Sequence, residues 1–389
     1  HLIILENFPA LTQNFLFEKN RCDDFLLFLN QAVFEKKNIY LYVCGEAVYE
    51  PQNFECIKRF QELLNAQVVC SVNGAFACVD LPNFYGHVGI GGHPDINHRW
   101  KNLGANDVLI ILGADFGDYH FLSSMSEVSS AWILSNLYQA YGFINESYQH
   151  RFAHPLHLLK GPIHQTLSYL IQYPISKSTI LAKGDFEKFK PQTVASEKVN
   201  LLEFYQKINK LWKKQTLCFE DVCTAYRDRQ YVLPIPNKNV QFFSSQDGSA
   251  MGGALGIGVG AKLAAPQKHC FIFMGDGCSR LVFGALSELA HLGIVIFILN
   301  NQSFGIVDDV YQKIYSHIDH KKHHVKLAAV DFVGLAKACF WDAEKLKPDL
   351  SNLESLIDKA YSTKRSLLIE IPCESFQSLG FNPRKLILK

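Results

Sequence analysis

The sequence predicts an α/β protein with two doubly wound domains, each built on a parallel sheet. Its 389 residues exceed what one ordinary core holds, so more than one domain is expected. Short apolar runs that end at Gly or a polar residue alternate with helical patterns, which is typical of buried parallel strands joined by helices. The clearest case is residues 271–306, where two such runs flank one helical segment in a strand–helix–strand unit.

The predicted first domain covers residues 21–175 and follows a lead-in linker at 1–20. Apolar residues at helical spacing predict helices at Cys22–Lys36 and Asn53–Leu64. Apolar runs predict the remaining elements, which are strands at Ile39–Cys44, Gln67–Ser71, Val108–Leu112 and Ala131–Leu134. The polar, Lys-rich stretch 176–199 is interpreted as a surface linker.

The predicted second domain covers residues 200–389. Its expected helices are Asn200–Lys214 and a Gly-rich one within Ser244–Pro266. Its expected strands are Thr216–Val222, Cys270–Met274 and Ile294–Leu299. Gly costs roughly 1 kcal/mol per helical site relative to Ala. The glycines of the Gly-rich helix therefore predict close approach of a second backbone or of a cofactor.

Oxygen-bearing residues follow the two apolar runs of the 271–306 unit. Gly275-Asp276-Gly277 ends the first run, and Asn300-Asn301 ends the second. Parallel strands end at one edge of the sheet, and open α/β sheets bind ligands there. Glycines let a backbone approach phosphate oxygens, and carboxylate and amide oxygens suit Mg²⁺. This stretch therefore predicts a site for a metal-bound diphosphate. A tight turn followed by an Asn-rich strand end is the bland alternative.

Composition excludes several function classes. The net charge of +1 provides no field for nucleic acid or an anionic membrane, so neither is an expected partner. No apolar run approaches the ~20 residues of a membrane span. Eleven scattered cysteines without CxxC spacing argue against a disulfide framework or a zinc site and favour a cytoplasmic location. The apolar start lacks the basic region and cleavage site of a signal peptide.

Four histidines invite a metal interpretation of the segment Pro82–Trp100 and its surroundings. They are His87, His93, His98 and His120. Their spacing fits no pair of ligands on one helix face, and no Cys or Glu joins them. A glycine-rich loop that faces a ligand or another domain is the favoured interpretation.

The GDG turn followed by NN after roughly two dozen residues resembles the thiamine-diphosphate (ThDP) signature. The resemblance implies that the Asp276 carboxylate, the Asn301 side chain and the Ser303 carbonyl hold Mg²⁺. It implies a further set of residues around the cofactor diphosphate, namely Gly275, Gly277, Cys278, Phe304 and Gly305.

The run Ser244–Pro266 resembles the G-x-M-G segment of the ThDP-dependent decarboxylase and acetolactate-synthase superfamily. By that resemblance Met251 is the catalytic wedge that bends the cofactor into a V, whereas plain core packing is the alternative. Gly248 and Ser249 would also contact the cofactor. Ala328–Phe340 resembles a helix of the same superfamily, and Ser366–Pro372 resembles its final strand. Residues 106–116 resemble a run of the same superfamily's central domain. Flavin-binding members have an Arg where this chain has Asp115, so FAD is not expected.

The resemblance implies a ThDP- and Mg²⁺-dependent enzyme that decarboxylates or ligates small 2-oxo acids. The activating glutamate of the family belongs to a pyrimidine-binding domain of roughly 150 residues, which this chain has no room for. We therefore expect a hetero-oligomer in which a separate pyrimidine-domain subunit completes the site, or else a longer natural chain from which that domain has been removed. The alternative is a non-catalytic ThDP-fold regulatory or cofactor-binding protein. A Rossmann dehydrogenase is a distant third, because no G-x-G-x-x-G follows a strand.

Overall fold

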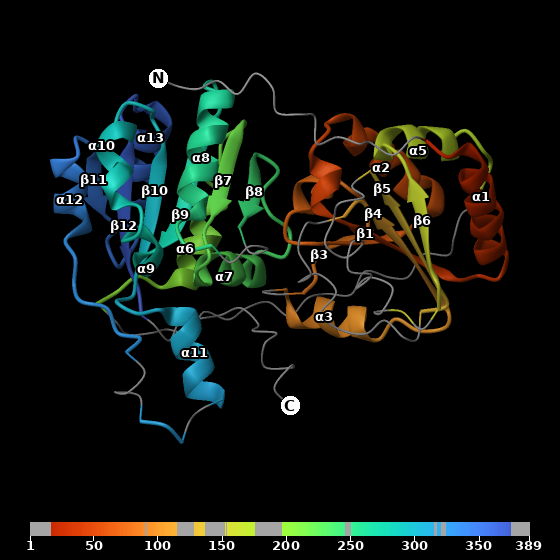
Figure 1. Ribbon diagram of the computed structural model, residues 1–389, viewed down its shortest axis with the longest axis horizontal. Coiled ribbons are helices and arrows are strands. Elements are labelled where there is room, and N and C mark those ends of the chain that lie inside the picture. The colour runs from red at the N-terminus through yellow and green to blue at the C-terminus, as the bar shows by residue number, and fades with distance from the viewer. Residues whose placement is uncertain are drawn as a thin grey trace.

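The computed structural model contains two parallel sheets that lie side by side (Figure 1). It describes residues 17–89, 92–114, 128–136, 152, 154–175, 197–245, 250–314, 317–319 and 324–374. Among these residues each sheet has six strands, and every strand pairing is parallel. The predicted fold class is confirmed. No helix among the described residues is both long and apolar enough to cross a membrane.

The first sheet has the order β3-β2-β1-β4-β5-β6. Its strands are β1 (Asn38–Val43), β2 (Gln67–Cys70), β3 (Phe84–His87), β4 (Asp107–Leu112), β5 (Ser130–Ser135) and β6 (Leu156–Lys160). The helical segments beside it are α1 (Lys19–Phe34), η1 (Gly45–Val48), α2 (Gln52–Leu64), η2 (Ala75–Ala77), α3 (Pro94–Lys101) and α5 (Ile163–Leu170). Strand β4 is buried along its whole length, as its continuous apolar run predicts.

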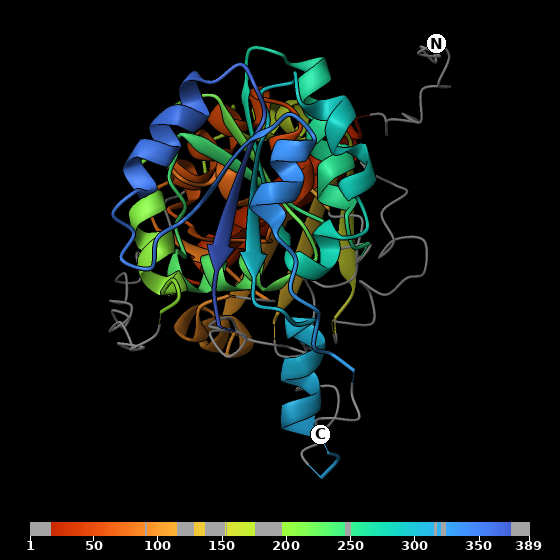
Figure 2. The ribbon, with the colours of Figure 1, turned by 90° about the vertical axis from the view of Figure 1, so that its left-hand side faces the viewer.

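The second sheet has the order β11-β12-β10-β9-β7-β8. Its strands are β7 (Thr216–Glu220), β8 (Val240–Ser244), β9 (His269–Gly275), β10 (Val295–Asn300), β11 (Asp342–Lys345) and β12 (Leu367–Pro372). Its helical segments are α6 (Leu201–Ile208), α7 (Thr224–Val232), α8 (Gly253–Ala264), α9 (Asp276–Ser279), η4 (Phe283–Ala285), α10 (Leu286–Leu289), α11 (Gly305–Ile314), α12 (Phe332–Ala338) and α13 (Leu353–Ser362). Turned by 90°, the strands of this sheet point toward α11 (Figure 2).

The prediction of a single crossover helix between the two apolar runs is wrong. Residues 276–289 form three short pieces, α9, η4 and α10. Gly284 lies inside η4, and glycine weakens a helix interior. The predicted helix Asn200–Lys214 also ends early, at Ile208. The Asn237 side chain binds the Asn209 carbonyl at 2.6 Å and holds the chain in its turn away from the helix.

The segment Pro82–Trp100 is not only a loop, because it contains β3 and α3. Proline occupies the first turn of α3, and the His93 ring caps this helix by accepting from the Asp95 N–H at 3.2 Å. His87 is buried, and burial beside Arg229 lowers the pKa of its ring to about 3. His120 lies outside the described residues. Within the described part of the chain, no three His, Cys, Asp or Glu residues form a group suited to a metal.

The two domains meet where β8 and α7 of the second face η2, β3 and α3 of the first (Figure 1). The Ser244 N–H donates to Asn73 Oδ1 at 2.9 Å across this boundary, and the His93 ring stacks on Tyr231 with ring centroids 5.9 Å apart. At Gly86 (φ +125°) an added Cβ would lie 2.7 Å from the Pro234 carbonyl oxygen, so only glycine fits there. Close contact at this boundary fixes the end of β8, which leads toward Met251.

Candidate active site

The two segments that carry the predicted metal ligands lie at one edge of the second sheet. Strands β9 and β10 are parallel neighbours, and Gly275 pairs with Leu299 near their carboxyl ends. Asp276 follows β9 directly, and Asn301 follows β10. The expectation that both strands end at the same edge is confirmed, because parallel pairing in register brings their last residues together.

The Asp276 side chain is only 1% exposed. Its Oδ1 accepts from the Gly277 N–H at 3.0 Å, whereas its Oδ2 is buried and has no hydrogen-bond partner among the described residues. Burial raises the pKa of this carboxyl to about 6, although the N–H groups of Gly277 and Gln302 and the charge of Arg280 act to lower it. A buried carboxylate oxygen without a partner is costly, and a divalent cation would satisfy it.

The chain after β10 forms a tight loop that returns oxygens to this edge. Asn301 Oδ1 accepts from the Ser303 N–H at 3.0 Å, and the Ser303 carbonyl accepts from the Gly305 N–H at 2.9 Å. An antiparallel bridge between Ser303 and Lys326 fixes the loop, and the Ser303 hydroxyl donates to Asp308 at 3.2 Å. These contacts hold Asn301 and Ser303 together in one compact loop directly after β10.

Several glycines of the site have no room for a side chain. An added Cβ at Gly277 would lie 2.7 Å from the Phe304 ring, and one at Gly305 would lie 2.8 Å from Asn301 Nδ2. These contacts place the predicted residues of the GDG turn against those of the loop after β10. Thr224 also reaches this region, because its Cγ2 lies 3.6 Å from the same Gly305 position.

The second predicted segment, Ser244–Pro266, contains Met251, which follows β8 in the chain and precedes α8. Its side chain is 37% exposed, so it is not ordinary core packing. Gly252 has a φ of +84°, and a Cβ there would lie 2.7 Å from Val282 and 3.7 Å from the Cys278 carbonyl oxygen. The turn that carries Met251 therefore lies beside the end of the GDG turn. Gly248 and Ser249 lie outside the described residues.

The glycines of α8 differ in their surroundings. A Cβ at Gly258 would lie 2.7 Å from Ile272, so close packing on β9 requires glycine there. Gly256 and Gly260 instead face open space. Beside Gly256, residues of α8, η4 and α10 line an apolar pocket of about 490 Å³. The expected close approach is thus found at Gly258 but not at these two positions.

A buried carboxylate that the sequence interpretation missed is that of Asp221, the first residue after β7. It is fully buried, and its Oδ1 accepts from the N–H groups of Val222 at 2.7 Å and Gly252 at 3.1 Å. Its Oδ2 accepts from the Ala254 N–H at 3.3 Å. The signal was present, since an acid directly after a buried strand is the same pattern that marks Asp276. It was included in a predicted strand instead.

A buried carboxylate also lies at the edge of the first sheet. Glu46 accepts from the Ala114 N–H at 2.8 Å, the Ser135 hydroxyl at 2.6 Å and the Asn136 N–H at 2.6 Å. These groups follow or end β4 and β5, and the strand order reverses between β1 and β4, where open sheets bind nucleotides. The Glu46 carboxylate, an anion that belongs to the chain itself, thus occupies the hydrogen-bond donors at the topological switch point. Asp115, on which the expectation against FAD was based, lies outside the described residues.

Comparison with known proteins agrees with the second domain's geometry. Residues 228–371 match the family described as thiamine pyrophosphate enzyme, C-terminal TPP binding domain. The acetolactate synthase large subunit of Lactococcus lactis subsp. lactis (strain IL1403) is 30% identical over 141 residues, which are 35% of this chain and 24% of that protein. The mitochondrial acetolactate synthase catalytic subunit of Saccharomyces cerevisiae (strain ATCC 204508 / S288c) is 27% identical over 132 residues, 33% and 19% of the two chains. The aligned region thus spans about a quarter or less of these relatives.

The fold is also similar to a solved structure. The Rhodococcus jostii RHA1 thiamine diphosphate-dependent 4-hydroxybenzoylformate decarboxylase superposes with a TM-score of 0.67 at 18% identity. The match covers 92% of this chain and 64% of that one. Because so much of this chain takes part, the likeness in fold extends to both sheets.

Proposed function

The chain belongs to the superfamily of ThDP-dependent decarboxylases and acetolactate synthases, and from this premise we propose that it is a subunit of a ThDP- and Mg²⁺-dependent enzyme acting on 2-oxo acids. The observation that supports this most is the buried Asp276 Oδ2 without a hydrogen-bond partner among the described residues. This oxygen belongs to the residue directly after β9, at the edge of the sheet where β10 also ends.

Asp276, Asn301 and the Ser303 carbonyl would hold the metal, and the glycines at Gly275 and Gly277 would let the backbone approach the diphosphate. Phe304 packs on Gly277 and keeps the turn and the loop together. Bound ThDP supplies the carbon nucleophile for attack on a 2-oxo carbonyl and accepts the electrons left when CO₂ departs. The chain's own part is to bind and orient the cofactor in a site that is largely buried.

Calorimetry tests the site. We expect the chain to bind ThDP only when Mg²⁺ is present, and Asp276→Ala to abolish this binding while the protein still melts cooperatively. An unchanged affinity in Asp276→Ala would end the assignment.

We propose further that the activating glutamate comes from a pyrimidine-binding partner subunit. Exposed apolar side chains in this domain support this, because exposed apolar surface marks interaction sites. Leu281 is 66% exposed and lines the apolar pocket beside Gly256, and Ile257 and Leu263 on α8 are 52% and 59% exposed. Gel filtration with a candidate partner, ThDP and Mg²⁺ is expected to give a hetero-oligomer. Full turnover by the chain alone would contradict the need for a partner.

None of the eleven cysteines, all of which are among the described residues, forms a disulfide, and we include a reducing, cytoplasmic location in the proposal on this basis. Decarboxylation and C–C ligation both begin with attack on a 2-oxo acid, so one assay covers both. CO₂ release from a panel of 2-oxo acids, with the partner present, identifies the acyl donor, and added aldehydes or 2-oxo acids as acceptors reveal ligation.

A non-catalytic ThDP-binding protein is the second candidate. Many members of the superfamily place Gln or His after the strand that corresponds to β7, whereas this chain has Cys223-Thr224-Ala225-Tyr226. Thr224 lies near the loop after β10 and offers one hydroxyl. Tight binding of Mg²⁺ and ThDP with no CO₂ release from any 2-oxo acid, partner present, would favour this candidate over the enzyme.

A further inference from the structure

Asp221 is a buried carboxylate that accepts hydrogen bonds from backbone N–H groups of one turn and of its own strand end. Its two oxygens hold the N–H groups of Gly252 and Ala254, which flank Gly253, while the N–H of Val222 anchors the carboxylate to β7. The carboxylate thus ties the turn 250–254 to the carboxyl edge of the sheet.

The turn 250–254 is the part of the chain that presents Met251. The N–H of Gly252 belongs to the peptide bond that begins at the Met251 carbonyl, so a hydrogen bond to this N–H fixes the plane of that peptide. The Gly253 N–H binds the Ala250 carbonyl at 3.2 Å and closes the turn. The position of the Met251 Cα therefore depends on the Asp221 carboxylate.

The same carboxylate is linked to the metal-binding turn. The Cys278 thiol donates to the Val222 carbonyl at 3.2 Å, and Val222 follows Asp221 directly in the chain. Cys278 follows Asp276 by two residues. Asp221 thus sits between the turn of Met251 and the turn of Asp276.

We propose that Asp221 is a positioning residue that sets the location of Met251 relative to the bound metal, and with it the fit of the cofactor's two rings. This rests on the proposed function, because it assumes that Met251 contacts the rings and Asp276 the metal. It goes beyond the predicted ligands, because Asp221 itself touches neither cofactor nor metal.

Comparison of two probes separates positioning from a general structural role. Inorganic pyrophosphate with Mg²⁺ reports only the metal and phosphate contacts, whereas ThDP with Mg²⁺ also reports the ring contacts made by Met251. In Asp221→Asn the amide NH₂ opposes a backbone N–H, so one hydrogen bond is lost and a donor faces a donor. We expect Mg²⁺-ThDP affinity to fall about tenfold or more, with Mg²⁺-pyrophosphate affinity unchanged.

A double-mutant cycle with Met251→Ala distinguishes a positioning role of Asp221 from a purely structural one. Met251→Ala alone is expected to weaken ThDP binding and to leave pyrophosphate binding intact. If Asp221 acts through Met251, Asp221→Asn in the Met251→Ala background causes little further loss. Equal losses in the two backgrounds would overturn the proposal.

Asp331→Asn is the matched control. Asp331 also accepts from a backbone N–H in the first turn of a helix, that of Gly334 at 2.8 Å, but it is exposed on α12. We expect it to change neither affinity. If Asp221→Asn does not melt cooperatively, Asp221→Glu replaces it, because the longer carboxylate keeps the charge and displaces the turn.

The outcomes are distinguishable. Equal loss of pyrophosphate and ThDP binding in a folded Asp221 variant, or no loss of either, would overturn the positioning role. Wild-type protein that binds neither probe with Mg²⁺ would overturn the cofactor assignment itself, and wild-type protein that binds both equally would show that Met251 makes no ring contact.

Discussion

The Phe304 ring lies on Gly277 so closely that an added Cβ would sit 2.7 Å from its Cε1 atom. Gly277 belongs to the turn after β9 and Phe304 to the loop after β10, so this contact joins the two halves of the candidate metal site. Gly277 does not require a left-handed backbone, and the restriction on a side chain here is one of space.

Gly277→Ala is therefore expected to push Phe304 and its loop away from Asp276. We expect a loss of about 1–3 kcal/mol in the free energy of unfolding from overpacking, with at least tenfold weaker Mg²⁺-ThDP binding. Calorimetry and thermal melts measure the two effects. Wild-type affinity in this variant would show that the contact does not hold the site together.

Gly256→Ala is the control, because nothing lies within 4 Å of the added Cβ and the residue is in α8. Removing a helical glycine is expected to stabilise the protein by about 0.5–1 kcal/mol. ThDP binding is expected to stay unchanged.

Asp276→Asn is expected to stabilise the metal-free protein while abolishing metal binding. The folded-state pKa of Asp276 rises from 3.8 to about 6, so the folded state binds a proton more tightly than the unfolded state does. This group's contribution to stability therefore falls as pH rises from about 4 to 6, and the cost above pH 7 is about 3 kcal/mol. An amide carries no such cost.

The measurement is a set of thermal melts from pH 5 to 8, with and without Mg²⁺ and ThDP. Mg²⁺ and ThDP are expected to raise the melting temperature of the wild-type protein at pH 7.5 and to leave that of the Asp276→Asn variant unchanged. A metal-free Asn variant that is less stable than wild type at pH 7.5 would contradict the assigned cost of burying this charge.

The strongest sequence signals came from buried parallel strands. Strands such as β4, β9 and β10 were predicted nearly to the residue, because continuous apolar runs that end at Gly or Asn have few other interpretations. Strand β3 was missed because Gly86 and His87 interrupt its apolar pattern, although both are buried where the two domains meet. Strand β6 was missed because most of its residues are only half-buried.

The candidate site was predicted where glycine and acid follow a strand, and Asp276, Asn301, Ser303 and Phe304 are brought together. Asp221 escaped because its partners are N–H groups some 30 residues away, and long-range hydrogen bonds leave no local pattern in the sequence. The buried role of Glu46 escaped for the same reason, since its partners follow or end strands far along the chain.

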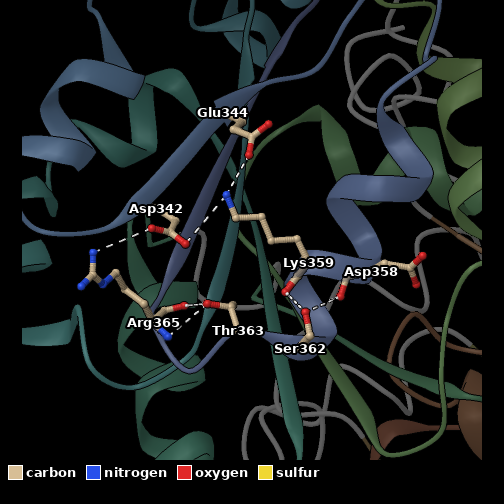
Figure 3. A network of polar contacts seen from close by, with 7 residues as sticks. All are labelled: Asp342, Glu344, Asp358, Lys359, Ser362, Thr363 and Arg365. Atoms are coloured by element: carbon tan, nitrogen blue, oxygen red, sulfur yellow. Dashed lines mark hydrogen bonds and ion pairs between the residues drawn. The ribbon is translucent and has the colours of Figure 1, made fainter.

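Lys359→Met is expected to cost little. The Lys359 ammonium on α13 reaches Glu344 at 2.7 Å and Asp342 at 3.8 Å on β11 (Figure 3). Its side chain is 38% exposed, so we expect less than about 1 kcal/mol of destabilisation, shrinking as salt is added. The hydrogen bond to Glu344 raises the pKa of Lys359, so its contribution is present below pH 10.5 and is lost at higher pH. Denaturant melts at low and high salt measure this, and a loss that persists in high salt would contradict it.

Glu46→Gln tests whether the crevice of the first sheet is a closed structural site. The carboxylate accepts from the Ala114 and Asn136 N–H groups and the Ser135 hydroxyl, whereas an amide would turn an NH₂ toward one of these donors. We expect a loss of about 2–4 kcal/mol in the free energy of unfolding, with Mg²⁺-ThDP affinity unchanged because the second sheet is untouched. Glu35→Gln, at an exposed residue just after α1, is the control and should cost under about 0.5 kcal/mol.

Glu46→Ala additionally opens a small cavity lined by the donors that Glu46 leaves behind, so added acetate or formate should restore part of the lost free energy of unfolding. Stabilisation of wild-type protein by FAD or ADP in thermal melts would show instead that nucleotides enter this crevice despite Glu46.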